Sequence, residues 1–236
     1  MRVLRYVQRE ITVSHQDFDR LKRWYWPLRN KFLPIYHSRI SDEANPVVNP
    51  QPRLPVILAV GHIATRKGQM VLAEAFSKIA ERHPDWKLWL AGHVGEANCQ
   101  QQIAQLASQL SPGKIEMLGQ HDDAPKLMRQ AAIYVQPSFH EGLPLSLQEA
   151  LWHGCACIAT EIPGNIELVE HERNGLLVPP GNVAAMATAL ERIIGDEDLR
   201  TRFAITGYDT IRRLEMTTAQ MTRKHQNLYA AILNQS

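Results

Sequence analysis

The sequence has few cysteines and no long apolar segment. Its three cysteines, Cys99, Cys155 and Cys157, are too few and odd in number for a disulfide framework, which favours a reducing compartment. No run of about 18 apolar residues appears, so no transmembrane helix is expected. The amino terminus carries charges through its apolar part and has no small-residue cleavage site, so it does not look like a signal peptide. We therefore expect a cytoplasmic protein.

A strong overall charge is also missing. The 236 residues carry a net charge of +2, which gives no support for a nucleic-acid partner, and none is expected. Residues 1–53 hold ten Lys and Arg against five Asp and Glu, so the basic charge lies at this end. A basic end is typical of a surface that faces an anionic membrane or an acidic acceptor, although a solvated basic face is the favoured interpretation. Peripheral binding to the inner face of the membrane is the alternative.

Recognisable metal-binding patterns are absent as well. The histidines show no H-E-x-x-H spacing. Cys155 and Cys157 alternate along an expected strand without further ligands, so at least one of them is expected to be buried. The pattern D-x-D occurs at residues 17–19 and 196–198, where it falls in an expected helix and at an expected helix cap. We expect no metal and no other cofactor.

The sequence does contain a regular alternation of apolar strands and helices from residue 54 onward. Residues 55–60 form an apolar run that is typical of a strand buried on both faces. Such alternation predicts a parallel, doubly wound, Rossmann-like α/β sheet, in which ligands bind beyond the carboxyl ends of the strands. Further strands are predicted at residues 86–90, 114–118, 132–136, 155–160 and 175–178, and helices at residues 68–82, 96–110, 123–131, 183–194 and 216–233.

The first 50 residues are too short for a complete domain of this kind. A short strand at residues 10–13, a helix capped by Ser14 and an extended piece within residues 29–36 are predicted. Residues 38–55 are polar and rich in proline, which is typical of a linker. The chain is thus expected to divide into an appendage with its linker and a main domain, at residues 1–50 and 51–236.

One stretch of the main domain carries two glutamates, Glu141 and Glu149, around a glycine turn and a helix start. Pro137 ends the strand at residues 132–136, and Pro144 stands where a first helical residue would, since its missing N–H costs nothing there. The free amides of the first helical turn then form a good anion site. The residues of that site are Gly142, Leu143, Pro144 and Leu145.

With E-G-L-P in the turn and seven residues between the glutamates, this stretch resembles the donor-side motif of retaining glycosyltransferases of the GT-B fold, family 4 or glycosyl transferases group 1. The resemblance implies that Glu141 lies beside the transferred sugar and that Glu149 binds the ribose hydroxyls of the nucleotide. It also implies that residues 51–236 are the nucleotide-sugar donor-binding domain and that residues 1–50 are a remnant of the acceptor-binding domain. The alternative for the motif alone is a pair of solvated charges near a helix start.

The loop at residues 61–68, G-H-I-A-T-R-K-G, resembles a second segment of this family, G-R-x-x-x-x-K-G, which clamps the donor diphosphate. Lys67 matches the lysine, whose charge would offset the charge that develops on the departing nucleotide. His62 stands at the arginine position, where a neutral imidazole donates one hydrogen bond and brings no fixed charge. The resemblance makes Gly61, His62 and Arg66 donor-binding residues, with Arg66 as the compensating cation. An ordinary surface loop with two cations is the alternative.

Four further segments resemble the family in order and spacing, so the resemblance spans about residues 56–194. They are the glycine turn at 91–95, the loop at 118–121, the turn and short helix at 158–169 and the N-G-L-L-V strand and turn at 174–181. The loop at 118–121 resembles the one whose backbone contacts the nucleotide base, although His121 itself is predicted to be an exposed loop residue. The turn at 91–95 supports only the topology. The last two segments need carry no chemistry, and Glu167 is predicted to be structural.

The resemblance implies transfer of a sugar, with retention, from a UDP- or GDP-sugar to a glycan or lipid-linked acceptor in surface polysaccharide or lipopolysaccharide synthesis. Glu141 and Lys67 would be the catalytic residues, which orient the sugar and stabilise the leaving nucleotide. The alternative is a truncated or split-chain module that binds nucleotide sugars and needs a partner chain for the acceptor domain. A related nucleotide-sugar epimerase is a third and less favoured hypothesis.

Overall fold

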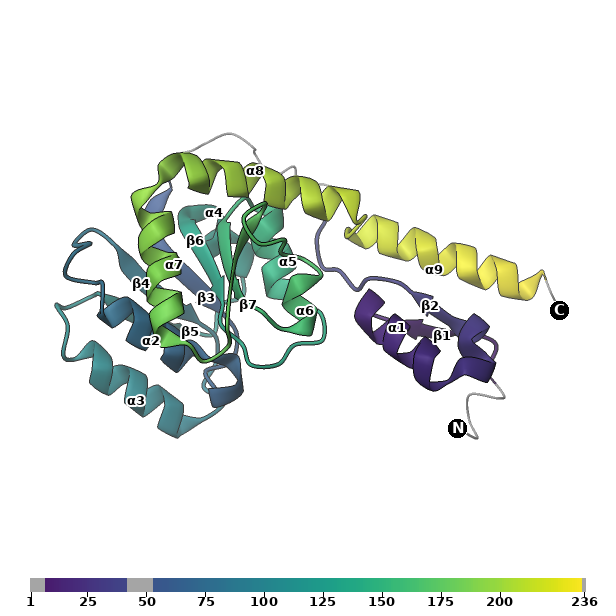
Figure 1. Cartoon of the computed structure of the whole chain (residues 1–236), viewed down its shortest axis with the longest axis horizontal. Coiled ribbons are helices and arrows are strands. Elements are labelled where there is room, and N and C mark those ends of the chain that lie inside the picture. The colour runs from purple at the N-terminus through teal and green to yellow at the C-terminus, as the bar shows by residue number, and fades with distance from the viewer. Residues whose placement is uncertain (1–6, 42–52, 235–236) are drawn as a thin grey trace.

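The main body of the protein is a six-stranded sheet flanked by helices, as the computed structural model of residues 7–41 and 53–234 shows (Figure 1). All neighbouring strands run parallel, in the order β5-β4-β3-β6-β7-β8. The predicted doubly wound parallel sheet is therefore confirmed. Most of the predicted linker lies outside the described residues. The strands are β3 (Leu54–Val60), β4 (Lys87–Ala91), β5 (Ile115–Gly119), β6 (Ala131–Gln136), β7 (Ala156–Thr160) and β8 (Gly175–Val178).

The chain reverses its direction across the sheet between β3 and β6. From β3 it proceeds outward to β4 and β5, then returns to the other side of β3 to form β6, and continues to β7 and β8. In sheets of this kind the crevice for ligands opens at the carboxyl ends of the two strands where the order reverses. The loops after β3 and β6 therefore frame the expected ligand position.

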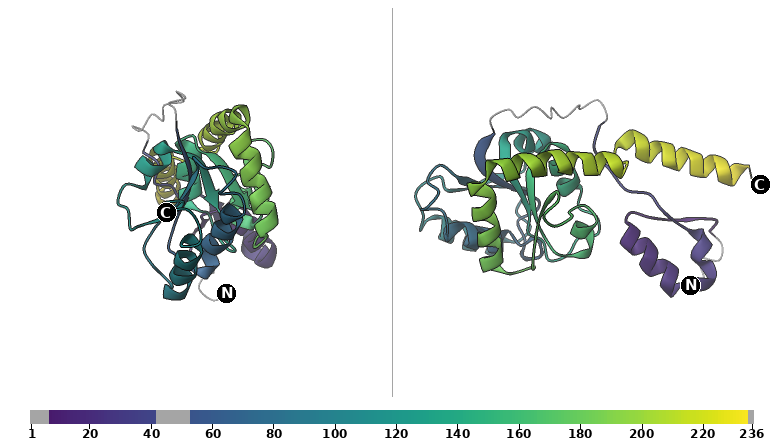
Figure 2. Two further views of the ribbon diagram at one scale, coloured as in Figure 1. Left: turned by 90° about the vertical axis from the view of Figure 1, so that its left-hand side faces the viewer. Right: turned by 45° about the horizontal axis from the view of Figure 1, so that its top comes forward.

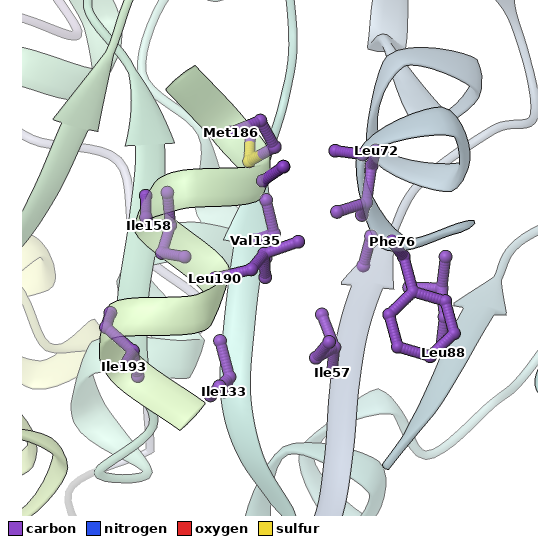
Figure 3. Packing of buried hydrophobic residues seen from close by; sticks show 14 of the residues in the cluster. Ile57, Leu72, Phe76, Leu88, Ile133, Val135, Ile158, Met186, Leu190 and Ile193 are labelled. Carbon is purple, nitrogen blue, oxygen red and sulfur yellow. The ribbon is translucent and has the colours of Figure 1, made fainter. Parts of the chain in front are cut away.

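Two apolar cores lie on opposite faces of the sheet, because successive side chains of a strand point to opposite sides. Ile57 and Ala59 of β3 join one core, whereas Leu58 joins the other. Helices α2 (Gln69–Ser77), α3 (Ala97–Ala107) and α7 (Val183–Gly195) cover the first face, whose packed side chains are shown in Figure 3. Helices α4 (Ala124–Gln130) and α5 (Leu145–Trp152) cover the second face.

Helix α8 (Glu197–Arg213) is the main element that the sequence analysis did not predict. Asp196 caps this helix, as expected for the second D-x-D, because its carboxylate accepts a hydrogen bond from the Leu199 N–H at 2.8 Å. The buried residues of this helix follow helical spacing and are Leu199, Phe203, Gly207, Thr210 and Ile211. Only three of the five are large and apolar, so the apolar stripe is too sparse to be recognised as an amphipathic pattern.

Three predicted helix boundaries are also wrong. Helix α2 ends at Ser77 and helix α3 at Ala107, because residues 78–82 and 108–110 form turns and bends rather than further helical turns. Pro144 does not occupy the first helical position of α5. Its backbone is extended, with φ of −73° and ψ of 113°, so it is the residue that caps the helix start.

Residues 7–41 form an appendage beside the main body (Figures 1 and 2). It consists of β1 (Glu10–Thr12), α1 (His15–Trp24), the 3-10 helix η2 (Trp26–Lys31) and β2 (Phe32–Pro34), and its two strands pair in parallel. The predicted helix cap is confirmed, since the Ser14 hydroxyl accepts a hydrogen bond from the Asp17 N–H at 3.1 Å. Helix α9 (Thr218–Leu233) projects from the main body on the side of the appendage. No helix in the described parts of the chain is long and apolar enough to span a membrane.

Glu167, which follows the short helix α6 (Pro163–Ile166), joins the main body to the appendage. Its carboxylate accepts hydrogen bonds from the backbone N–H groups of His15, at 3.1 Å, and Gln16, at 2.7 Å. These groups begin α1, where a negative charge is favourable. Burial and the same carboxylate raise the pKa of Tyr36 in the appendage. Glu167 thus has the structural role that we expected.

Candidate functional site

The loops after β3 and β6 are fastened to each other at the carboxyl edge of the sheet. The Phe139 N–H donates a hydrogen bond to the Arg66 carbonyl at 2.9 Å, which ties the loop after β6 to the 3-10 helix η3 (Thr65–Lys67). Gly68, with φ of 69°, lies so close to Pro137 that a Cβ atom there would be 2.0 Å from the Pro137 carbonyl oxygen. A residue without a Cβ atom is therefore required for the two loops to meet.

Lys67 and Glu141 form an ion pair between these two loops. Lys67 Nζ lies 2.6 Å from Glu141 Oε1, and the two side chains are 18% and 11% exposed. A pair that is largely removed from water is screened less by salt than a pair on the surface. The structure thus brings the two residues that the sequence analysis expected to be catalytic into direct contact.

Two further donors hold the Glu141 carboxylate. The side-chain amide of Gln136 donates to Oε1 at 2.9 Å, and the hydroxyl of Ser138 donates to the same oxygen at 2.7 Å. Hydrogen bonds to an ionised carboxylate are stronger than bonds between neutral groups. With Lys67, three donors converge on one oxygen atom, so the carboxylate has a fixed position and orientation.

The orientation of the Gln136 amide is itself fixed from behind. Its oxygen accepts hydrogen bonds from the Tyr134 hydroxyl at 2.8 Å and the Ser146 hydroxyl at 3.2 Å. Burial is the main cause that raises the pKa of Tyr134, so this phenol keeps its proton. With the amide oxygen engaged, the amide nitrogen must point at Glu141. The sequence analysis missed this relay, although a glutamine that ends an apolar strand was a signal for it.

Gly142 faces open space, since no atom lies within 4 Å of a Cβ built there. The close approach occurs instead at Gly164, in α6. A Cβ on Gly164 would be 2.4 Å from the Gly142 carbonyl oxygen and 2.9 Å from that of Glu141. Gly164 therefore supports the motif loop from behind, while the side of Gly142 that a ligand would approach is free.

Helix α5 begins directly after this loop. The first backbone hydrogen bond of α5 runs from the Gln148 N–H to the Pro144 carbonyl at 3.2 Å. The amides of Leu145 and Ser146 come before that bond and have no partner within the helix, which is usual for a helix start. Leu143 and Leu145 are half-buried and Pro144 is buried. The loop and the helix start expected from the sequence are thus present, and their binding of an anion stays a prediction.

Glu149 lies one turn further along α5 and is half-buried. Burial raises the pKa of its carboxyl, and the charge of Arg39 in the appendage opposes that effect. Glu141 and Glu149 both help to raise the pKa of Tyr134. The two carboxylates therefore lie near the same phenol, although no hydrogen bond joins them within the described residues.

His62, at the arginine position of the family pattern, lies against another histidine. Its ring centroid is 3.9 Å from that of His93, which belongs to the loop after β4. Its backbone carbonyl accepts a hydrogen bond from the buried Gln69 amide at 2.7 Å. Partial burial, His93 and the cations Lys67 and Arg66 lower the pKa of His62. At neutral pH the site therefore has a lysine and a neutral imidazole where the family pattern has two cations.

The other residue types that could bind a metal ion do not gather into a site in the described parts of the chain. Asp17 pairs with Arg20 at 2.7 Å, and Asp196 caps α8. Cys99, Cys155 and Cys157 are free and buried. Across residues 7–41 and 53–234, no three or more His, Cys, Asp or Glu side chains are grouped in a way that could hold a metal ion. His121 is exposed, as predicted.

Solved structures of glycosyltransferases share this fold. A glycosyltransferase from Rickettsia africae superposes with a TM-score of 0.85 and 23% sequence identity, over 97% of this chain and 64% of the other. HepE of Anabaena, solved with UDP and glucose, has a TM-score of 0.78 and 19% identity, over 95% of this chain and 63% of the other. The carboxyl-terminal domain of a group 1 glycosyl transferase from Francisella tularensis has a TM-score of 0.64 and 26% identity, over 76% of this chain and 95% of that domain.

Curated relatives are similar in sequence. A lipopolysaccharide core biosynthesis glycosyltransferase of Rhizobium meliloti (strain 1021) is 30% identical over 158 residues, which cover 66% of this chain and 44% of the relative. A phosphatidyl-myo-inositol mannosyltransferase of Mycolicibacterium smegmatis is 30% identical over 171 residues, or 70% of this chain and 43% of the relative. The chain spans less than half the length of these relatives. The model of the family "Glycosyl transferases group 1" matches residues 54–196, so the chain belongs to that family of glycosyltransferases.

Proposed function

We propose that this chain binds a nucleotide sugar and forms the donor side of a retaining glycosyltransferase. The observation that supports this most is the Lys67–Glu141 ion pair, which lies between the two loops at the reversal point of the sheet. A cation and a carboxylate beside a helix start suit a ligand that carries both a phosphate and a sugar. Residues 51–236 would be the donor domain, and residues 1–50 the remnant of an acceptor domain with its linker.

Each residue of the site then has a chemical role. The diphosphate lies against the amides at the start of α5 and against Lys67, while Glu149 binds the ribose hydroxyls. Lys67 stabilises the charge that develops on the departing nucleotide, which is where a fixed cation lowers the barrier. Gly61, Arg66 and the open side of Gly142 provide the surrounding contacts.

Glu141 orients the sugar rather than attacking it. Its Oε1 already accepts hydrogen bonds from Lys67, Gln136 and Ser138, and donors of this kind withdraw electron density from a nucleophile. The bond from sugar to phosphate then breaks without forming a covalent intermediate on Glu141. The acceptor hydroxyl forms its bond to the sugar from the same face and gives its proton to the departing phosphate, and the enzyme contributes by positioning the reactants.

The choice of donor and acceptor follows the relatives. The Anabaena enzyme was solved with UDP and glucose, and the curated relatives act in lipopolysaccharide core synthesis and on phosphatidyl-myo-inositol. We propose a UDP- or GDP-sugar as donor and a glycan or lipid-linked acceptor, reached at the inner face of the membrane. The acceptor surface would come from the appendage or from a partner chain.

A thermal-shift titration with UDP, GDP and ADP tests the donor site. A ligand at about 100 times its Kd stabilises the native state by about 2.7 kcal/mol, which is a rise in Tm of roughly 5–10 °C for a protein of this size. We expect one nucleotide to raise the Tm of the wild type and of the control Glu116→Gln, and to leave that of Glu149→Gln unchanged. Glu116 forms an exposed ion pair with Lys87.

The proposal fails if none of the nucleotides shifts a cooperative transition, or if Glu149→Gln responds as the wild type does. A nucleotide that binds allows a transfer assay with the matching nucleotide sugar and a lipid-linked acceptor. Transfer by the chain alone would assign the acceptor surface to the appendage. Binding without transfer would point to a partner chain.

A further inference from the structure

His62 and His93 lie ring against ring at the carboxyl edge of the sheet, with their planes inclined by 44°. His62 belongs to the loop after β3, and His93 to the loop after the neighbouring strand β4. Both side chains are exposed, so a ligand can reach them from solvent. The sequence analysis assigned His93 no role.

The backbone, rather than the rings, sets this pairing. The two loops continue the parallel ladder beyond their strands, with the Gly61 N–H donating to the Ala91 carbonyl at 2.8 Å and the Ile63 N–H to the His93 carbonyl at 2.9 Å. Gly92 permits this close approach, because a Cβ there would be 2.0 Å from the Gly61 carbonyl oxygen. The two imidazoles are therefore held together before any ligand binds, which lowers the entropy cost of binding across them.

Cations face the pair from the next element along the chain. Partial loss of contact with solvent, then the neighbouring His93 ring, and after these the charges of Lys67 and Arg66 of η3 lower the pKa of His62. In the free protein His62 is therefore neutral at pH 7. An anion that neutralised the charges of Lys67 and Arg66 would therefore raise the pKa of His62 again.

The acidic side chain of the adjoining helix does not supply a counter-charge to the rings. Glu96, at the start of α3, accepts hydrogen bonds from the Thr65 N–H at 3.1 Å and the Thr65 hydroxyl at 2.6 Å. Glu141, the acid beyond Lys67, is held by the donors described above. Both carboxylates are thus committed to other donors, so a negative charge in contact with the rings would come from a ligand.

We infer that His62 and His93 form a proton-accepting phosphate site, in which the diphosphate of a nucleotide sugar binds across both rings and draws a proton onto them. This inference rests on the proposed function, which places a diphosphate at this edge of the sheet. A phosphate anion beside an imidazole favours the charged form. The pair would then supply, only when the ligand is bound, the positive charge that an arginine would supply permanently.

Calorimetric titration with an intact nucleotide sugar tests this inference. UDP-glucose or GDP-mannose is used, according to the base that the thermal titration selects, because their diphosphates are diesters without the terminal phosphate proton that titrates near pH 6. Titrations at pH 7.5 in buffers of different ionisation enthalpy give the number of protons taken up. The variants are His62→Gln, His93→Gln and His62→Arg, with the exposed His121→Gln as the matched control.

We expect the wild type and His121→Gln to take up about one proton per nucleotide sugar and to lose affinity by up to about tenfold per pH unit as the pH rises. His62→Gln and His93→Gln should each lose most of the uptake, and His62→Arg should bind without uptake and with less pH dependence. Binding of the nucleotide sugar without proton uptake, or uptake that persists in His93→Gln, overturns the inference and leaves the proposed function standing. If neither nucleotide sugar binds, both the inference and the proposed function are wrong.

Discussion

Two glycines with the same backbone angle allow a sharp test of how the site is assembled. Gly68 and Gly119 both have φ of 69°. At Gly119 no atom lies within 4 Å of a built Cβ, whereas at Gly68 that Cβ would be 2.0 Å from the carbonyl oxygen and 2.8 Å from the carbonyl carbon of Pro137. Alanine at Gly119 therefore measures the backbone cost alone, and alanine at Gly68 measures that cost together with the clash.

The expected magnitudes are well separated. A left-handed backbone costs an alanine about 1–2 kcal/mol, so Gly119→Ala should lower the free energy of unfolding by about that amount. At Gly68 the loop after β6 must also move by about 1 Å to relieve the contact, and overpacking of this kind adds about 1–3 kcal/mol. We therefore expect Gly68→Ala to cost roughly 2–5 kcal/mol in total.

Urea unfolding of both variants and the wild type, followed by circular dichroism, gives the two free energies with the slopes as a check on two-state behaviour. The displacement at Gly68 also separates Lys67 from Glu141, so nucleotide binding should weaken in Gly68→Ala. Equal losses of stability in the two variants would refute the reasoning, because they would show that the loops after β3 and β6 are not in contact.

Three further predictions concern buried and half-buried groups. His153 is neutral in the folded state, since burial, then Arg129 and Arg53, lower its pKa from 6.5 to about 4. As the pH falls from 6.5 to 4, the unfolded chain therefore takes up a proton at this histidine that the folded protein does not. The free energy of unfolding of the wild type should fall by about 3 kcal/mol over this range, and that loss should be absent in His153→Gln. Stability profiles of the two proteins that run parallel against pH would contradict this. The three buried thiols should react with a thiol reagent only after unfolding, and rapid labelling of the native protein would show that their burial is wrong. Arg53→Met should lower stability by roughly 2–4 kcal/mol in urea unfolding, because the guanidinium donates to the carbonyls of Met128, Ala131 and His153; an unchanged midpoint would mean that water replaces these bonds.

The sequence determined the class of fold and the position of the motif. Apolar runs of strand length and helices with an apolar face are local patterns, so the alternation of strands and helices could be read without knowing what packs against what. The order of a parallel sheet then places the loops that carry Lys67 and Glu141 at one edge. The strands at 175–178 and 132–136 agree with β8 and β6 to within one residue.

Local patterns did not reveal α8, because Gly207 and Thr210 occupy buried positions between Phe203 and Ile211, so too few residues of its buried stripe are large and apolar. Nor did they distinguish Pro144 as a capping residue from a first helical residue, since the φ of −73° that the proline ring permits is compatible with both positions. In each case the local signal was compatible with more than one structure, and packing decided between them.

The tertiary structure alone decided how the site is held. The Gln136 relay behind Glu141, the support of the motif loop by Gly164 and the pairing of His62 with His93 join residues that are 5, 22 or 23, and 31 positions apart in the sequence. In the case of Gln136 the partner is near in the sequence, but the direction of its amide depends on a phenol buried in the second core. Contacts of these kinds leave no periodicity in the sequence, because they depend on which loops and buried side chains the fold brings together.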